Sequence, residues 1–444
     1  MKTRLYRVLT TALFVLVSLP ALGAANAGLA LQEAIQKAQE GDPWLDASRD
    51  RERAYQAESI SAGTLPDPRV SVTARNLPVD TFDFNQEAMT QFSVGVTQMF
   101  PRGDTLELRR HGKKLQADEQ AIQRSERRAR VRLIVSRLWL TAYEAQNSIE
   151  LIERDRNLFE QLVDVAESSY GSALRQARQQ DVVRAQLELT RLEDRLSDLR
   201  RREAAARRRL GEWIGQQAAD RSLIGALPQS SAIYPGPQVV LSNASNRAVT
   251  DTLVSHPRIR VLDKRVSVAS NEADLARQKY WPEWGVTASY GYRDRAPGGP
   301  DRADLFSVGV TFDLPIFTSK RQDSRLNAAI ARKGAVKTDQ VLELRSLRAK
   351  LDTASAELKQ LNHRVELYGQ RLLPQMQEQA EAALTAYNND DGDFAEAVRA
   401  RIDELNARIE ALAIDVARGK VRAQINYLLS GAEASQVAQG GHYE

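Results

Sequence analysis

The sequence predicts a mainly α-helical protein with a small β part, arranged as two copies of one helix-hairpin-helix repeat. The β part is predicted by two nearly identical runs, FSVGVTQMFP at Phe92–Pro101 and FSVGVTFDLP at Phe306–Pro315, in which apolar residues alternate with polar or small ones. A period of two is typical of a strand with one apolar and one polar face. The helices are predicted by abundant Ala, Leu, Glu, Arg and Gln, with 27% of all residues charged.

Residues 1–27 have the pattern of an export signal. Lys2, Arg4 and Arg7 precede an apolar run at 8–22, and Ala25-Asn26-Ala27 fits a cleavage site. The run is shorter than the ~20 residues of a bilayer-spanning helix. We therefore expect a cleavable signal peptide, and the absence of cysteine excludes lipidation on a cysteine, disulfides and thiolate chemistry.

The net charge gives no sign of a nucleic-acid partner. The formal charge is +4, and the three positive residues of the signal account for most of it. The arginine-rich runs at 124–132 and 200–209 are interpreted as solvated faces of coiled coils.

The chain repeats itself with a constant offset. Pro43 and Pro257 are 214 residues apart, and so are Phe92 and Phe306, which indicates an internal duplication. We predict a first repeat at 28–227, with strands at about 69–75 and 92–100 and a long helical hairpin at 104–214. A linker at 228–245 leads to a second repeat at 246–431, with strands at about 285–293 and 305–314 and a helical hairpin at 319–430. A flexible tail follows at 432–444.

The long helices carry apolar residues at a spacing that indicates coiled-coil packing. In the last helix this spacing alternates between 4 and 3 residues, and a mean near 3.5 predicts left-handed supercoiling. Pro374 is expected to kink the helix that contains it. The apolar positions of the last helix are Val398, Ile402, Leu405, Ile409, Leu412 and Val416.

The strand pattern assigns one face of each hairpin to lipid and the other to a lumen. The residues predicted to face lipid are Val70, Val72, Phe92, Val94, Val96, Val286, Tyr290, Phe306, Val308 and Val310. Those predicted to face the lumen are Ser71, Thr73, Arg75, Ser93, Thr97, Thr287, Ser289, Arg293, Ser307 and Thr311. The alternative is a soluble β-layer whose apolar face packs inward on helices.

Four strands are too few to close a barrel, and open strand edges are not tolerated in lipid. An exported chain of this kind must therefore pool its strands with other copies. A trimer would supply 12 strands, an even number within the range of outer-membrane barrels.

The mature sequence resembles the TolC-type outer membrane efflux channels along essentially its whole length. The order of elements is similar, and so are the Asp42-Pro43 and His256-Pro257 openings, the two strand runs, Leu372-Leu373-Pro374-Gln375 and Arg184-Ala185-Gln186. Within that family the chain is most similar to the outer components of heavy-metal resistance-nodulation-division systems. The resemblance implies a homotrimer with a 12-stranded transmembrane barrel in the cell outer membrane and a long periplasmic tunnel. It also implies a periplasmic adaptor (membrane fusion) protein and an inner-membrane efflux pump as partners.

The turn of the second helical hairpin is the candidate periplasmic gate. It carries Asp390, Asp391, Asp393 and Glu396, although Asp at a turn is also ordinary turn chemistry. In the family, the helix that starts here carries acidic rings, and Glu396 falls at the first of those positions. The second position holds Arg399, which departs from the family pattern.

No catalytic, cofactor-binding or metal-binding constellation is predicted. The four histidines, His111, His256, His363 and His442, are dispersed without ligand spacing. We therefore expect no enzyme and no cofactor. The preferred hypothesis is the exit duct of a tripartite efflux system, and the alternatives are the outer membrane duct of a type I polypeptide secretion system or a soluble periplasmic coiled-coil structural protein.

Overall fold

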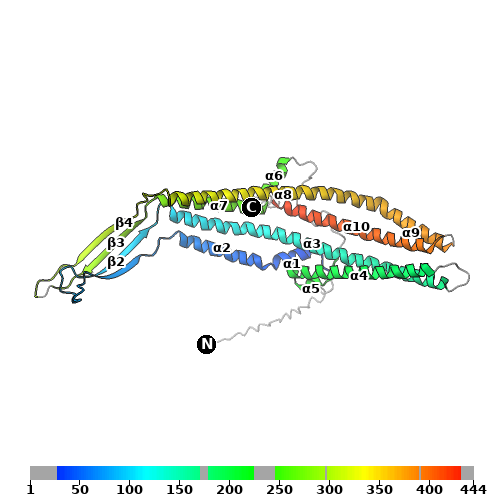
Figure 1. Cartoon of the computed structure of the whole chain (residues 1–444), viewed down its shortest axis with the longest axis horizontal. Coiled ribbons are helices and arrows are strands. Elements are labelled where there is room, and N and C mark those ends of the chain that lie inside the picture. The colour runs from blue at the N-terminus through cyan, green and yellow to red at the C-terminus, as the bar shows by residue number, and fades with distance from the viewer. Residues whose placement is uncertain (1–27, 171–178, 225–245, 296–297, 390–391, 432–444) are drawn as a thin grey trace, which may run out of the picture.

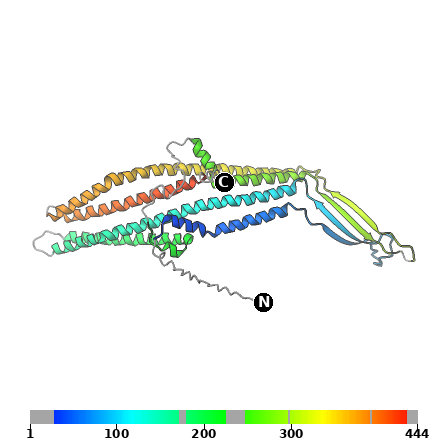
Figure 2. The same cartoon turned by 180° about the vertical axis from the view of Figure 1, so that it is seen from behind.

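The computed structural model describes residues 28–170, 179–224, 246–295, 298–389 and 392–431. The predicted signal peptide, the whole predicted linker and the predicted tail lie outside these residues. The protein is elongated, with a small sheet at one end and helices that run along the rest of the long axis (Figure 1). The opposite view shows the same arrangement, with two helical hairpins extending away from the sheet (Figure 2).

The first repeat begins with two helices and a pair of strands, followed by a long helical hairpin. Its elements are α1 (Leu31–Glu40), α2 (Pro43–Ala62), β1 (Arg69–Arg75), β2 (Gln91–Phe100), α3 (Thr105–Tyr170), α4 (Gln179–Ile214) and the short α5 (Gln216–Ala219). The second repeat has the same order. Its elements are α6 (Asn246–Val254), α7 (Pro257–Arg277), the 3-10 turn η1 (Gln278–Tyr280), β3 (Trp284–Tyr292), β4 (Leu305–Phe312), α8 (Gln322–Leu367), the π-helical turn η2 (Tyr368–Leu372), α9 (Leu373–Asn388) and α10 (Phe394–Leu428).

The offset of 214 residues holds in the folded elements. Helices α2 and α7 begin at Pro43 and Pro257, and helices α4 and α10 end at Ile214 and Leu428. Proline suits the first turn of a helix, because the N–H that it lacks has no partner there. In both repeats the preceding side chain caps the helix: an Asp42 carboxylate oxygen accepts from the Trp44 N–H at 3.1 Å, and His256 Nδ1 accepts from the Arg258 N–H at 3.2 Å.

The four strands form one antiparallel sheet in the order β1-β2-β3-β4. The two hairpins are thus joined through β2 and β3, and β1 and β4 are the edges. The helices beside the sheet follow the same order, since α2 packs on α3, α3 on α7 and α7 on α8. A layer of four strands therefore continues into a layer of four helices, and both layers are open at two sides.

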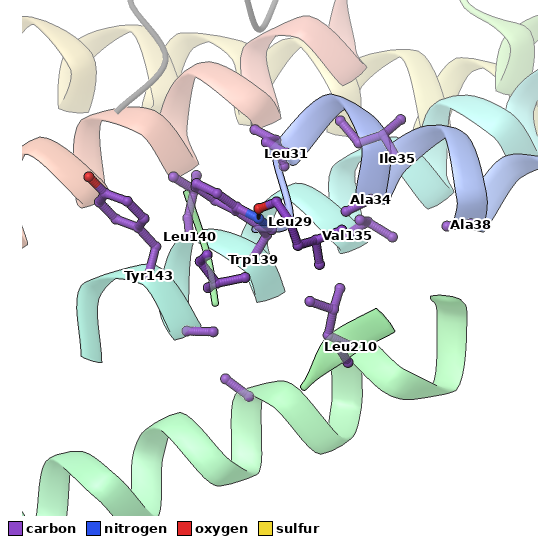
Figure 3. Packing of buried hydrophobic residues seen from close by; sticks show 14 of the residues in the cluster. Leu29, Leu31, Ala34, Ile35, Ala38, Val135, Trp139, Leu140, Tyr143 and Leu210 are labelled. Atoms are coloured by element: carbon purple, nitrogen blue, oxygen red, sulfur yellow. Dashed lines mark hydrogen bonds between the residues drawn. The ribbon is translucent and has the colours of Figure 1, made fainter. Parts of the chain in front are cut away.

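The buried core lies in the helical part. One cluster joins α1, α3 and α4 near the N-terminal segment, and there Trp139 Nε1 donates to the Leu29 carbonyl at 3.1 Å (Figure 3). A second cluster holds the two helical hairpins together through α3, α4 and α10. A third joins α6, α7 and α8 to α10. The apolar positions predicted along α10 are all buried or half-buried in these clusters.

The helix that contains Pro374 departs from regular α geometry just before the proline. The regular helix is interrupted earlier, by the π-helical turn Tyr368–Leu372, and α9 then starts with Pro374 in its first turn. Proline cannot donate to the carbonyl four residues before it, and its ring clashes with that carbonyl. A π-helical turn inserts a residue at this place and absorbs the conflict.

Candidate functional site

All ten residues that the sequence assigns to lipid lie on one face of the sheet. The register places Val72 opposite Val94, Val94 opposite Tyr290, and Tyr290 opposite Phe306. Residues paired in this way point to the same side of a sheet. All ten side chains are exposed, from Val286 at 39% to Phe306 at 72%.

The opposite face of the sheet is polar or small. Ser93 and Gly95 are buried there. The hydroxyls of Thr97 and Thr287 lie 2.9 Å apart, and Ser93 Oγ donates to the Thr73 carbonyl at 3.2 Å. A sheet in water normally hides its apolar face, and this one exposes it. The alternative of a soluble β-layer packed inward on helices is therefore wrong, because the apolar face is uncovered and the sheet extends beyond the helices (Figure 1).

The apolar face is banded along the strands. Aromatic residues occupy its loop end, where Phe92 pairs with Tyr292, and its helix end, where Phe100 pairs with Trp284. Between them the rows are mostly valine, as in Val70, Val96 and Val308. Phe92 and Phe100 are eight residues apart, roughly 26 Å along a strand. That length and the aromatic ends match an apolar band of about 25 Å flanked by aromatic girdles.

Exposed apolar residues continue from the helix end of the sheet into the following loop. Leu314, Ile316 and Phe317 follow β4 and are exposed, Phe317 to 89%. Trp281, just before β3, is also exposed. These four residues therefore lengthen the exposed apolar surface beyond the helix end of the strands.

Sequence reasoning missed an ion pair that fastens the base of the sheet. The Arg102 guanidinium pairs with the Asp313 carboxylate and donates to the Trp281 carbonyl at 3.1 Å. Asp313 also accepts from the Glu283 N–H at 2.7 Å, directly after β4, which ends at Phe312, two residues before its predicted end. The pair joins the exit of β2 to the exit of β4. No local pattern marks it, because its partners lie in different repeats and have no equivalents at an offset of 214.

The candidate gate is only partly within the described residues. Asp390 and Asp391 lie outside them. Asp393 is the N-cap of α10, and its carboxylate accepts from the Ala395 N–H at 3.1 Å. Beside it, the rings of Tyr387 and Phe394 meet edge to face, with centroids 5.3 Å apart. The Asp393 carboxylate therefore caps the N-terminus of α10.

Glu396 and Arg399 lie in the first turns of α10, three residues apart, and both are exposed. They therefore lie on neighbouring parts of one helix face. Figure 1 shows that the hairpin of α9 and α10 turns near the end of the molecule farthest from the sheet. Glu396 also stands in the first turn of α10, where a carboxylate is favoured by the helix dipole. Arg399 lines a groove between α10 and α4. Asp393, Glu396 and Arg399 thus lie within the N-cap and first two turns of α10, and the gate stays a prediction.

Two further properties concern only the described ranges. Within them, no helix combines the length and the apolar character that a bilayer-crossing helix requires. The same residues contain no group of three or more His, Asp or Glu side chains placed to hold a metal ion.

The comparisons with known proteins agree with this architecture. Residues 248–430, most of the second repeat, match the family described as outer membrane efflux protein. No curated protein sequence matches the chain at a significant level. The resemblance to the outer membrane efflux channels that the sequence indicates is confirmed.

Solved structures of low sequence identity share the fold. The outer membrane protein VceC from Vibrio cholerae has a TM-score of 0.72 at 15% identity, over 90% of this chain and 96% of that one. The MtrE outer membrane channel of Neisseria gonorrhoeae, in its open state, has a TM-score of 0.68 at 16% identity, over 90% and 89%. CusC, which forms a transmembrane channel, has a TM-score of 0.71 at 15% identity, over 90% and 91%.

Proposed function

We propose that this chain is one third of an exit duct, because residues 248–430 match the outer membrane efflux protein family and outer membrane channels share the fold over 90% of the chain. Three copies close their sheets into a 12-stranded barrel in the outer membrane. Below the barrel their helices form a tunnel through the periplasm, which receives substrate from an inner-membrane pump and a periplasmic adaptor protein. Residues 1–27 direct export and are then removed.

The exposed apolar face of the four-stranded sheet is the observation that carries this proposal. Its ten exposed apolar residues would be costly in water, since they form one continuous apolar surface. Its edges, β1 and β4, offer unpaired backbone groups that lipid cannot satisfy. Joining β1 of one copy to β4 of the next removes both edges. The four-helix layer supports the same closure, because α2 and α8 lie on its two outer sides just as β1 and β4 do.

The periplasmic gate is proposed at the tip of α9 and α10. Three copies would bring three sets of Asp390, Asp391, Asp393 and Glu396 toward one axis. Like charges at a narrow mouth repel one another, concentrate cations and offer oxygen atoms to divalent ions. Docking of the adaptor would then release the contacts that hold the mouth closed.

The closure can be tested by disulfide trapping, since the chain has no cysteine of its own. Cysteines would be placed at Ser71 on β1 and at Ser307, Gly309 or Thr311 on β4. Within one chain these strands are three spacings apart, roughly 14 Å, which no disulfide can bridge. After mild oxidation of membranes, one of the pairs is expected to give a covalent trimer on a non-reducing gel.

Two controls define the result. The paired positions Thr73 and Ser93 within one chain should give an internal disulfide and no oligomer when changed to cysteine. Each single cysteine should give no trimer. If no β1–β4 pair gives a trimer while the internal control oxidises, the sheet does not close between copies and the duct is refuted.

A further inference from the structure

A groove of about 550 Å³ lies between α4 and α10, close to the tip of the helical hairpins. Arg184, Arg191 and Arg195 of α4 and Arg399 of α10 line it. The groove is therefore lined by four guanidinium groups, although the tip beside it is acidic. Its volume is in the usual range of small-molecule sites, ~300–1,000 Å³.

The positive charge of the groove is only half compensated. Two carboxylates, Glu188 and Asp403, line it as well. Arg191 donates to Glu188 at 2.5 Å and is satisfied. Among the described residues, neither Arg184 nor Arg399 makes an ion pair.

Arg195 is the most enclosed of the four arginines. It is half-buried, and its side chain donates to the neutral amide oxygen of Asn406. Burial lowers the pKa of Arg195 and the positive charge of Arg202 lowers it further, while the more distant Glu410 carboxylate offsets part of this effect. Among the described residues Arg195 makes no ion pair, and it is only partly hydrated, so an anion there would gain more than it would at an open surface.

The floor of the groove is apolar. Leu192 and Val398 are buried, Ile402 is half-buried, and all three continue into the cluster that holds the two hairpins together. An arginine-lined groove with an apolar floor suits a ligand that has both an apolar body and acid groups. The planar fork of each guanidinium matches the two oxygens of a carboxylate or phosphate.

We propose that this groove binds a small organic anion that carries two acid groups, its apolar body on Leu192, Val398 and Ile402 and its acid groups on Arg195 and Arg399. The site uses residues of a single chain. It therefore does not depend on the closure of the sheet or on the partners proposed for the duct.

The test is a fluorescence titration of the detergent-solubilised full chain at low salt with 2,6-naphthalenedicarboxylate. We expect one site per chain. Arg195→Gln and Arg399→Gln should each weaken binding about tenfold, the usual loss of a charged hydrogen bond. Asp403→Asn should strengthen binding, because it removes a repelling carboxylate. Arg154→Gln is the matched control, since Arg154 is exposed on α3 and pairs with Glu150 outside the groove, and it should change nothing.

Simpler probes separate the parts of the proposal. Succinate lacks the apolar body and 2-naphthoate lacks the second acid group, so both should bind at least tenfold more weakly than the dicarboxylate. Circular dichroism checks that the variants remain folded. The proposal is overturned if the dicarboxylate does not bind, or if Arg195→Gln and Asp403→Asn leave its affinity unchanged. It is also overturned if hexaglutamate binds and the small dicarboxylate does not, since the groove would then take an acidic protein segment.

Discussion

The two repeats place the same elements at the same offset, yet they fasten them with different chemistry. In each repeat the N-cap residue of one helix contacts, directly or through one side chain, an aromatic residue near the end of the last long helix. These pairs are Asp42 of α2 with Trp213 of α4, and His256 of α7 with Tyr427 of α10. In the first repeat the contact is charged: Asp42 accepts from Arg127 Nε at 2.7 Å, and the Arg127 guanidinium lies 5.2 Å from the Trp213 ring centre. In the second it is neutral: His256 Nε2 donates to the Tyr427 carbonyl at 3.0 Å, and the two rings meet edge to face.

This difference shows what a duplication preserves. The cap and the aromatic partner keep their places because the backbone of the repeat requires both. The side chains between them are free to change, provided that each buried polar group finds a partner. In the second repeat the Tyr427 hydroxyl also donates to Glu126 of α3 at 2.9 Å, and burial raises the pKa of Tyr427 to about 12. The contact of His256 with Tyr427 and of Tyr427 with Glu126, called the joint below, therefore links the second repeat to the first.

The repeats differ most in how their long helices are anchored. Trp139 on α3 is buried and fastens the N-terminal segment, whereas Thr353, 214 residues later on α8, is exposed. Trp139→Ala should therefore lower the free energy of unfolding by about 3–5 kcal/mol through loss of packing. Denaturant titration of the detergent-solubilised protein measures this. Thr353→Ala is the control and should stay within about 0.5 kcal/mol; equal effects would mean that both helices are anchored alike.

The strands allow a matched test of the sheet faces in both repeats. Val94 and Val308 occupy equivalent positions on the apolar face, and Thr311 lies on the other face. Val94→Arg and Val308→Arg should each cost about 2–4 kcal/mol if the face meets lipid near its midplane. The expected result is loss of the protein from the outer-membrane fraction, while Thr311→Arg still inserts. Comparable damage on both faces would show that the lipid and lumen assignments are mistaken.

Acid should weaken the joint of the second repeat through His256. Burial lowers the pKa of His256 to about 4 from an ordinary value of 6.5. In the unfolded chain the His256 imidazole is therefore protonated below about pH 6.5, whereas in the folded chain it is protonated only below about pH 4. Stability is complete above pH 6.5 and falls as the pH drops from 6.5 to 4, by at most about 3 kcal/mol.

His256→Asn isolates that effect, because Asn caps a helix without titrating in this range. The variant should lose less stability than the parent between pH 7 and pH 4.5, as measured by thermal unfolding. Parallel pH curves for the two proteins would show that His256 does not carry the acid sensitivity.

The smallest effect on stability is expected at the tip of the second hairpin. Exchanging Asp390, Asp391, Asp393 and Glu396 for Asn and Gln keeps the N-cap oxygen of α10, so unfolding should change by less than about 1 kcal/mol. In planar bilayers, however, cation preference and block by divalent cations should both weaken. Glu150→Gln, on an exposed part of α3, is the control. Unchanged selectivity and block in the fourfold variant would place the gate elsewhere.

Much of the architecture could be predicted because its signals are local and repeated. The period of two in the strands, the apolar spacing near 3.5 in the helices and the prolines that open α2 and α7 each depend on neighbours along the chain. The duplication then showed each signal twice, which fixed the strands to within about two residues. For the same reason the sequence alone assigned one face of the sheet to ten apolar residues, and the structure shows them together and exposed.

Only the tertiary structure decided the features that depend on residues far apart. The pairing of β2 with β3, the ion pair of Arg102 with Asp313 and the joint of His256 with Tyr427 each connect segments separated by well over a hundred residues, and no periodicity reports such contacts. The sequence by itself determined which elements form and which face of each is apolar, since local sterics and side-chain periodicity set both. The three-dimensional packing determined how those elements meet, because contacts between distant residues depend on geometry that no stretch of sequence contains.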